Sequence, residues 1–220
     1  MTADLPLETF SVLAALPGII HGFTGRLAGL DVKADREIAL QRLDDFHAAA
    51  RAQLGLAARR FITAEQVHGR EIAVVDEKNT APVPGVDGLI TASPAACLGI
   101  HVADCCAVFL ADPVRRVVAL LHSGRKGSEL GITTAAVGRM RADFGCAPAD
   151  ITVQLSPCIR PPQYELDFAA LIVAQARAAG VHQVFDSGTC TGANVGRYYS
   201  YRVERGKTGR MLALLALSPL

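Results

Sequence analysis

Two apolar runs joined by a short polar turn constrain the fold of this chain more than any other sequence feature. Residues 105–111 and 117–122 are almost wholly apolar, and the segment Asp-Pro-Val-Arg at 112–115 lies between them. Two β-forming runs around such a segment predict an antiparallel hairpin with a four-residue loop. The pairing within this hairpin then determines which side chains of the two strands can meet.

The register of the hairpin brings a cysteine and a histidine together. If Ala111 opposes Arg116, the same pairing places Cys105 directly opposite His122. Opposed side chains share one face with Cβ atoms about 4.5 to 5.5 Å apart, which is close enough for a thiolate and an imidazole to bind one ion. A slip of one residue would move them to opposite faces. Because side chains alternate along a strand, Cys106 is expected to point away from such a site.

A second histidine completes a three-ligand set. His68 lies in the segment Glu-Gln-Val-His-Gly at 65–69, where Gly69 allows a tight turn that projects the imidazole. Catalytic zinc sites characteristically use three protein ligands and leave a fourth position open, and one Cys with two His is an established set. The sequence therefore predicts a zinc site of His68, Cys105 and His122. The same pair would also suit a metal-free hydrolase with Cys105 as nucleophile and His122 as base.

A glycine-rich basic segment directly follows His122. It has the sequence Ser-Gly-Arg-Lys-Gly at 123–127 and leads into a predicted helix. Backbone N–H groups at a glycine-rich helix entrance bind anions, and two cations beside them favour that interpretation. The segment is too short for a P-loop, and taken alone it fits an anion site and a solvated basic loop equally well.

Predicted strands and helices come in groups along the chain and do not alternate regularly. This grouping favours an α+β architecture with mixed sheets over a doubly wound parallel one. No repeat or dividing linker is present, so residues 1–220 are expected to form a single domain. Helices are predicted at 35–56, 128–144 and 166–179, and strands at 60–63, 71–75, 88–91, 96–102, 105–111, 117–122, 151–155, near 184, and at 198–203 and 211–217.

Charge and hydropathy argue against several classes of protein. Lys and Arg total 22 against 21 Asp and Glu, without the basic cluster that neutralises nucleic-acid phosphates. The longest apolar run, at 211–217, is far below the ~20 residues needed to cross a bilayer. The first twenty residues lack the basic segment of a secretory signal, so a cytoplasmic protein is expected. Its six cysteines are then expected to be reduced thiols.

Several ordered motifs together resemble the laccase-domain family, from about residue 21 to the C-terminus. They are His-Gly-Phe-Thr-Gly-Arg at 21–26, Gln-Val-His-Gly at 66–69, Val-Asp-Gly at 86–88, Ala-Asp-Cys at 103–105, His-x-Gly-x-x-Gly at 122–127, Ser-Pro-Cys-Ile at 156–159, Tyr-Ser-Tyr-Arg at 199–202 and Thr-Gly-Arg at 208–210. Members of this YfiH-like family have been described as multicopper polyphenol oxidases and, more recently, as zinc-dependent purine nucleoside phosphorylases that also deaminate adenosine. The family's metal ligands fall on His68, Cys105 and His122.

The resemblance implies a fold, a cofactor and an activity. The implied fold has four layers, α/β/β/α, with mixed sheets. The implied cofactor is one Zn²⁺, because one Cys and two His make a single site and give little support to multi-site copper chemistry. The implied reaction is phosphorolysis of a purine nucleoside by inorganic phosphate, with adenosine deamination as a second activity, in a monomer or a homodimer.

Further residues are candidates for roles in that reaction. Arg26, Arg125 and Lys126 are the candidates to bind phosphate. Asp104, beside Cys105, is a candidate for proton transfer and equally for supporting the fold. Cys105 and His122 are expected to act in catalysis through the metal, which lowers the pKa of a bound water to about 7 or polarises a substrate oxygen.

Departures from the family pattern bear on substrate choice. Where the family has His-Ala-Gly-Trp-Arg-Gly, this chain has His-Ser-Gly-Arg-Lys-Gly at 122–127, and a Ser-Leu-Asn motif that normally follows residue 26 is missing. Lys126 acts as a point charge and does not reproduce the bidentate contact of Arg with an oxyanion. The loop therefore predicts a specificity shifted from neutral nucleosides toward anionic substrates. The alternatives are amide hydrolysis, such as peptidoglycan precursor editing, and a paralogue that kept the fold and lost the activity.

Overall fold

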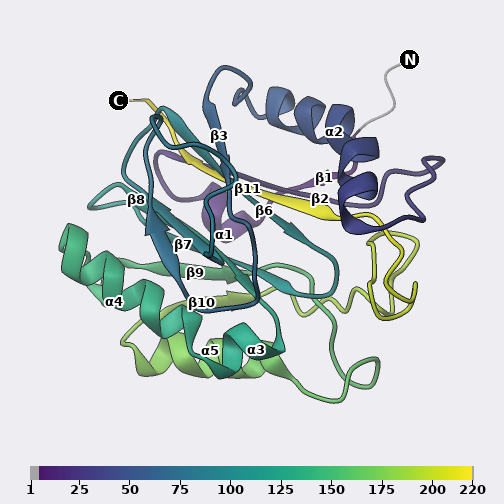
Figure 1. Cartoon of the computed structure of the whole chain (residues 1–220). Helices are drawn as coiled ribbons and strands as arrows, with labels where there is room; N and C mark the ends of the chain where they lie inside the picture. Colours follow the sequence, from purple (N-terminus) through teal and green to yellow (C-terminus); the bar gives the residue numbers. More distant parts are fainter. Residues whose placement is uncertain (1–4, 220) are drawn as a thin grey trace.

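The computed structural model describes residues 5–219, whose helices and strands follow one another as Figure 1 shows. The helices are α1 (Ser11–Ala14), α2 (Arg36–Gln53), α3 (Arg125–Glu129), α4 (Ile132–Phe144) and α5 (Phe168–Ala178), with a 3-10 turn at Pro148–Asp150. The strands are β1 (Leu7–Glu8), β2 (Ile19–Thr24), β3 (Arg60–Thr63), β4 (Ile72–Val74), β5 (Gly88–Thr91), β6 (Ala96–Val102), β7 (Cys106–Asp112), β8 (Val117–Ser123), β9 (Thr152–Leu155), β10 (Gln183–Asp186) and β11 (Met211–Leu217). None of the helices in this part of the chain is long and apolar enough to span a membrane.

The strands form two sheets of mixed pairing. One sheet has five strands in the order β1-β2-β11-β6-β3, and the other has six in the order β10-β9-β7-β8-β5-β4. The pairs β3 with β6, β4 with β5 and β9 with β10 are parallel, and the other neighbours are antiparallel. The prediction of an α+β fold with mixed sheets is confirmed.

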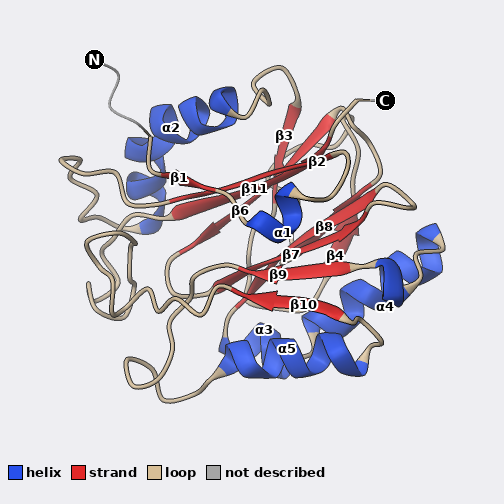
Figure 2. Cartoon of the chain, turned by 180° about the vertical axis from the view of Figure 1, so that it is seen from behind, coloured by secondary structure: helices blue, strands red, loops and turns tan. Residues whose placement is uncertain are grey.

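Three apolar clusters hold the two sheets and the helices together in four layers. The largest lies between the sheets, where Leu98 and Leu215 of the first share a cluster with Phe109 and Leu120 of the second. Another cluster joins the second sheet to α4 and α5, and a third joins the first sheet to α2. Figure 2 shows α2 outside one sheet and α3, α4 and α5 outside the other. The implied α/β/β/α arrangement is confirmed, and β7 and β8 are buried throughout because both of their faces are covered.

The hairpin of β7 and β8 forms as predicted, but in a different register. Ala107 opposes His122, so Cys105 lies two residues away from the predicted direct pairing. The Asp112 carboxylate accepts hydrogen bonds of 2.9 Å from the backbone N–H groups at 114 and 115, which moves the four-residue turn to 113–116. A shift of two residues preserves the face, so Cys105 remains on the same side of the sheet as His122.

Two other predicted elements differ from the structure. The helix predicted at 128–144 is divided into α3 and α4 near Gly131, which has a left-handed φ of 78°. The strand predicted at 198–203 is wrong, because Glu204 closes that segment into a turn. Its backbone N–H donates to the Ser200 carbonyl (3.0 Å), and its carboxylate accepts from the Ser200 N–H (3.0 Å). The prediction also missed β2. Within β2, Gly22 packs closely against Leu54, since a Cβ at position 22 would lie 2.8 Å from the Leu54 side chain.

Candidate active site

The three predicted metal ligands converge at one end of the space between the sheets. His68 comes from the loop between β3 and β4, Cys105 directly precedes β7, and His122 belongs to β8. One ligand atom from each lies within 4.8 Å of the other two. The two imidazole rings are 4.7 Å apart between centroids and cross at 80°. This group of side chains could hold a metal ion.

A buried aspartate shapes the loop that carries His68. The carboxylate of Asp87, which is wholly buried, accepts hydrogen bonds from the backbone N–H groups of Val67 (3.1 Å), His68 (2.9 Å) and Gly69 (2.7 Å). These contacts hold His68 at a φ of 60°, a conformation that residues other than glycine adopt infrequently. Asp87, which directly precedes β5, therefore fixes the loop conformation that presents His68.

The same carboxylate orients the second histidine. Asp87 Oδ1 lies 2.7 Å from His122 Nδ1, and the His122 side chain is almost fully buried. This contact places the Nδ1 proton between His122 and Asp87 and leaves Nε2 as the nitrogen available to a metal. A carboxylate behind a metal-binding imidazole fixes the ring and raises its basicity. Asp87 lies in the Val-Asp-Gly motif at 86–88, but the local sequence does not indicate a role for its carboxylate.

Electrostatics within the cluster favour a thiolate at neutral pH. Burial alone would raise the pKa of the Cys105 thiol, but the charge of His122 and hydrogen bonds from His122 and His68 lower it to about 6. Burial works against the charged His122 imidazolium, yet Cys105 and Asp87 raise its pKa to about 9. The thiolate is the form of cysteine that binds metals and acts as a nucleophile.

The glycine-rich segment at 123–127 has a steric function. A Cβ on Gly124 would lie 2.5 Å from the Cys105 sulfur, so only glycine leaves that sulfur its place. A Cβ on Gly127 would lie 3.2 Å from the carbonyl oxygen of Gly69, in the loop that carries His68. The two glycines therefore allow the start of α3 to pack directly against the ligands. The helix that follows is short, because α3 ends at Glu129.

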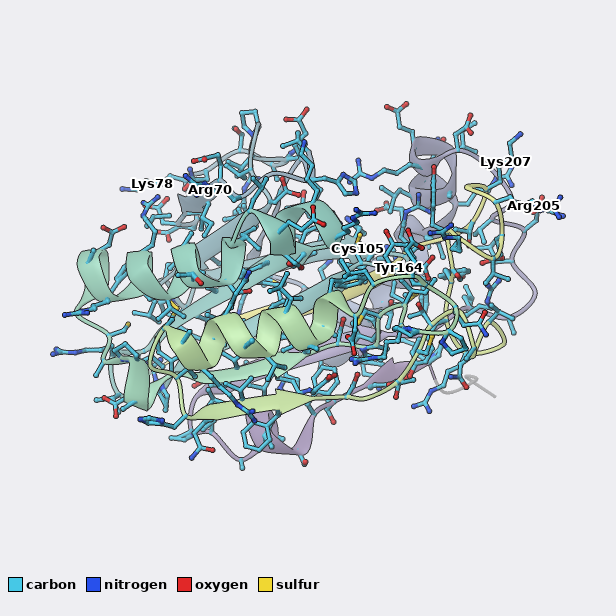
Figure 3. The ribbon with its side chains drawn as sticks, turned by 90° about the horizontal axis from the view of Figure 1, so that it is seen from below. Arg70, Lys78, Cys105, Tyr164, Arg205 and Lys207 are labelled. Atoms are coloured by element: carbon cyan, nitrogen blue, oxygen red, sulfur yellow. The ribbon has the colours of Figure 1, made fainter. Side chains whose placement is uncertain are left out.

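The ligands open onto a pocket of about 950 Å³, a size suited to a small organic molecule. Residues of both sheets and of α2, α3 and α5 contribute to its walls. Figure 3 labels Cys105 and Tyr164, both of which line the pocket. The lining residues are Asp35, Arg36, Gln66, His68, His101, Ala103, Asp104, Cys105, His122, Gly124, Arg125, Lys126, Glu129, Ile159, Tyr164, Phe168, Tyr201, Arg202, Gly206 and Arg210.

The structure brings two of the three predicted phosphate-binding residues to this pocket. Arg125 and Lys126 line it, although Arg125 also pairs with Glu129 (3.0 Å). Arg26 does not line it. The Arg26 guanidinium pairs with Glu204 (2.6 Å), donates to a backbone carbonyl at 198 and lies over the Tyr199 ring.

Asp104 reaches the pocket but has several partners of its own. Its carboxylate accepts hydrogen bonds from Thr191 Oγ1 (2.7 Å), Ser200 Oγ (3.0 Å) and the backbone N–H of Arg202 (2.7 Å). Asp104 itself has a φ of 79° and immediately precedes Cys105. These contacts tie the segments around 191 and 200 to the start of β7, which fits the support of the fold named as one of its two expected roles.

Several pocket residues were missed by sequence reasoning. Arg36, His101, Arg202 and Arg210 add polar and charged groups, and Tyr164, Phe168 and Tyr201 add aromatic surface. Arg202 and Arg210 lie within quoted motifs, so a signal was present for them. Arg36 lies at the start of a helix without any motif, and nothing in its local sequence distinguishes it from a solvated surface residue.

Comparison with known proteins identifies related sequences over the whole length of the chain. The profile of a family described as "Multi-copper polyphenol oxidoreductase laccase" matches residues 24–170 and 162–218. A protein of Streptomyces coelicolor named purine nucleoside phosphorylase is 34% identical over 229 aligned residues, which cover 88% of this chain and 93% of that protein. A protein of the same name from Deinococcus radiodurans is 32% identical, with 99% and 95% of the two chains covered.

Solved structures show the same fold. The crystal structure of YlmD from Geobacillus stearothermophilus matches with a TM-score of 0.83 at 24% identity, covering 98% of this chain and 100% of that one. The structure of a hypothetical protein YfiH from Bacillus licheniformis matches with a TM-score of 0.78 at 25% identity, covering 90% and 92% of the two chains.

Proposed function

The chain belongs to the multi-copper polyphenol oxidoreductase laccase family, and we propose that it is a zinc-dependent purine nucleoside phosphorylase that also deaminates adenosine. The observation that carries this proposal is the convergence of His68, Cys105 and His122 at the wall of a pocket large enough for a nucleoside. Relatives at 32–34% identity that bear the name purine nucleoside phosphorylase support the substrate class.

The donor set fits zinc. One thiolate and two neutral imidazoles are ligands that Zn²⁺ binds well, and three of them leave a position for substrate or water. The lowered pKa of Cys105 supplies the thiolate at neutral pH, and Asp87 holds the His122 ring so that Nε2 would bind zinc once the metal displaces its proton. When bound, zinc would act as a Lewis acid or lower the pKa of a water molecule to about 7. A single centre with these three ligands gives no support to multi-copper oxidase chemistry, which needs more sites.

The chain's own residues would position the two substrates for phosphorolysis. In that reaction a phosphate oxygen bonds to the anomeric carbon of the ribose while the bond from that carbon to the purine nitrogen breaks, and the nitrogen gains a proton. Tyr164, Phe168 and Tyr201 offer aromatic surface for the purine. Arg125 and Lys126 are cations at the pocket wall that attract anionic groups of the purine substrate, with Cys105 and His122 at the reacting end.

We also propose that the altered loop at 122–127 shifts specificity toward anionic substrates. Tyr164, Phe168 and Tyr201 would supply aromatic surface in place of the tryptophan that the family has in this loop. The shift in specificity would therefore come from the charges of the loop. Arg125 and Lys126 place two cations where the family has one. Inosine and adenosine would then show higher KM values than their 5′-monophosphates.

The decisive experiment measures release of the free base from inosine and adenosine by zinc-loaded protein, with and without inorganic phosphate. Phosphate-dependent release of hypoxanthine is the expected result, together with conversion of adenosine to inosine. The 5′-monophosphates and the double variant Arg125→Trp/Lys126→Arg test the loop, and the variant should lower KM for the neutral nucleosides. Release that does not depend on phosphate, or no turnover of any purine nucleoside, would contradict the proposed activity.

The close thiolate–imidazole pair favours a second candidate function, a metal-free hydrolase with Cys105 as nucleophile and His122 as base. Chelation separates the two. Removing zinc should abolish phosphorolysis and zinc should restore it, whereas a cysteine hydrolase would retain amide hydrolysis in chelator and lose it on alkylation of Cys105.

A further inference from the structure

Two arginines of the pocket have no carboxylate partner within the described part of the chain. Arg36 and Arg210 both line the pocket, and neither lies within 4.0 Å of a carboxylate oxygen. The other two arginines of the wall differ from them. Arg125 pairs with Glu129, and Arg202 pairs with Glu165 (2.7 Å). Arg36 and Arg210 therefore form no ion pair with any described residue.

Arg210 is buried and held by hydrogen bonds from one of its guanidinium nitrogens, while the other two remain available. Its residue is only 8% exposed, and Nη1 donates to the backbone carbonyls of Thr208 (2.7 Å) and Gly209 (2.9 Å). Nε and Nη2 make no hydrogen bond to any residue in the range 5–219. The backbone carbonyl of Arg210 in turn lies 3.1 Å from Nε2 of the buried His47. These two nitrogens are not fully enclosed by the protein, so both are accessible to a ligand in the pocket.

The two arginines lie close enough to repel each other. Burial and the neighbouring charge of Arg36 both lower the pKa of Arg210, while Cys105 and Asp104 partly offset this. His101 lies beside them, and burial together with His47, Arg36 and Arg210 holds its pKa well below its usual range. A neutral His101 offers a ring N–H without adding charge. An anion bound here would relieve the repulsion between the guanidinium groups.

The carboxylates nearby do not provide that compensation. Asp104 is occupied by its own three hydrogen bonds, and Asp35 is exposed at the start of α2 without an ion pair to Arg36. Planar guanidinium forks match the oxygens of phosphate better than they match a monatomic anion. The chemistry of this part of the pocket therefore suits a tetrahedral oxyanion.

The placement of these residues also suits a reaction with two substrates. Arg36 begins α2, His101 belongs to β6 and Arg210 directly precedes β11, so all three lie on the side of the first sheet. Figure 1 shows α2 lying against the sheet that contains β6 and β11. His122 belongs to β8 of the second sheet, and Cys105 directly precedes β7 of the same sheet. An oxyanion at Arg36 and Arg210 would thus face the candidate metal centre across the pocket.

We propose that Arg36, Arg210 and His101 form an oxyanion subsite that binds inorganic phosphate as a substrate. This inference rests on the proposed phosphorylase activity and assigns its phosphate to different residues from Arg26, Arg125 and Lys126. The bound phosphate presents an oxygen toward the middle of the pocket, between the two sheets. Arg36 and Arg210 are positioned to contact the substrate itself, so they are binding residues and not merely supports.

The test compares Arg36→Ala, Arg210→Gln and Arg210→Lys in zinc-loaded full-length protein. We expect Arg36→Ala to raise KM for phosphate about 10- to 100-fold while KM for inosine changes less than about twofold, since the variant removes a charge-assisted hydrogen bond to the anion. Arg210→Lys should retain part of the affinity that Arg210→Gln loses. Arg42→Ala is the matched control, because Arg42 is an exposed residue of α2 that lies outside the pocket wall.

Calorimetric titration of inorganic phosphate provides a readout that needs no turnover. Binding to the wild type that weakens at least tenfold in Arg36→Ala supports the subsite even if no nucleoside is cleaved, which would count against the proposed activity alone. Arg36 is exposed, so this variant decides the matter if Arg210→Gln does not fold. An Arg36→Ala protein that binds phosphate like the wild type overturns the proposal, as does a phosphate KM that responds to Lys126→Ala instead.

The 5′-monophosphates distinguish the two sources of the oxyanion. If Arg36→Ala raises KM for inosine 5′-monophosphate and leaves KM for inorganic phosphate unchanged, the subsite receives the nucleotide's own phosphate, and the assignment to inorganic phosphate is wrong. If KM for inorganic phosphate rises with either purine substrate, the assignment holds.

Discussion

Buried thiols and imidazoles occur in two regions of this molecule, and the two regions treat them in opposite ways. At the candidate metal centre, the pKa of Cys105 falls to about 6 and that of His122 rises to about 9. In the core of the first sheet and α2, burial raises the pKa of Cys97 to about 12 and lowers that of His47 to about 4. Burial disfavours the charged form in both regions.

The difference lies in the partners. Cys105 and His122 stabilise each other's charge, and Asp87 adds a second acceptor for His122. Around Cys97 desolvation outweighs the charges of Arg51 and Arg59, and around His47 the nearby charge is the cation Arg51, which lowers the pKa further. Burial of a cysteine or histidine is therefore no guide to reactivity here, and reactivity follows the charges beside the buried group.

The largest effect is expected from Cys105→Ser. Purified wild-type protein should carry close to one zinc per chain, and the variant should lose most of it because a hydroxyl is a far poorer ligand than a thiolate. Elemental analysis after purification without chelators measures both. Cys106→Ser is the matched control, since Cys106 packs on the other face of the sheet against α4 and α5 and should leave the zinc in place. Full zinc occupancy in Cys105→Ser would remove the contrast between the regions.

Selective alkylation should separate the two regions in the metal-free protein. With a pKa of about 6, Cys105 is mostly thiolate at pH 7, whereas Cys97, with a pKa of about 12, is almost wholly protonated and buried. Iodoacetamide should therefore modify Cys105 first, with a rate that is half-maximal near pH 6, and zinc should protect it. Peptide mapping by mass spectrometry identifies the modified residue. Equal labelling of Cys97 in folded protein would contradict the assignment.

Asp87→Asn should weaken the centre without dismantling the fold. An amide retains one acceptor oxygen but cannot stabilise charge on His122, and loss of a carboxylate behind a metal-binding histidine typically costs about 10- to 100-fold in metal affinity. Competition with a fluorescent zinc chelator measures the change. Asp76→Asn serves as control, because Asp76 also accepts a backbone hydrogen bond, from Lys78, but is exposed and away from the pocket. Unchanged zinc affinity in Asp87→Asn would show that the carboxylate serves only the loop.

The smallest effect concerns acid stability. His47 is neutral in the folded protein, with a pKa of about 4, but takes up a proton near pH 6.5 when unfolded. Its contribution to stability is therefore complete above about pH 6.5 and is lost as the pH falls toward 4. Between pH 7.5 and 5.5 this amounts to about 1 kcal/mol. Urea unfolding of metal-free protein should show that His47→Gln flattens the pH dependence by this amount, while His182→Gln, a substitution at an exposed residue, should not. An equal slope in wild type and His47→Gln would place the titration elsewhere.

Much of the fold followed from local pattern. The apolar runs at 96–102 and 211–217 predicted β6 and β11 with their observed bounds, because a buried strand needs a continuous apolar run between turn residues. The segment at 198–203 misled the same reasoning, since its aromatic residues suggested a strand. There Tyr198 and Tyr199 are buried just before a turn, and Glu204 accepts the hydrogen bond of the Ser200 N–H that a neighbouring strand would have accepted.

Two of the three ligands, Cys105 and His122, could be paired from sequence because their placement depends on a period of two. Cys105 and His122 share a face in the predicted register and in the observed one, since the two differ by two residues. The observed pairing depends on Asp112, whose carboxylate accepts hydrogen bonds from the N–H groups at 114 and 115. The turn therefore covers 113–116, one residue later than the predicted 112–115. That side-chain contact is local, but its effect on register appears only once the strands pair.

Sequence by itself thus determined the hairpin, the apolar layers and the candidate ligands His68, Cys105 and His122. Only the tertiary structure decided which charges serve the pocket. Arg26 pairs with Glu204, 178 residues away, while Arg36 and Arg210 meet at one wall from opposite ends of the chain. Hydrophobic periodicity can be recognised in a short stretch of sequence, because the buried face of a helix or strand recurs every few residues. The pairing of a charge depends on which distant side chain folding brings within reach, and no local pattern records that.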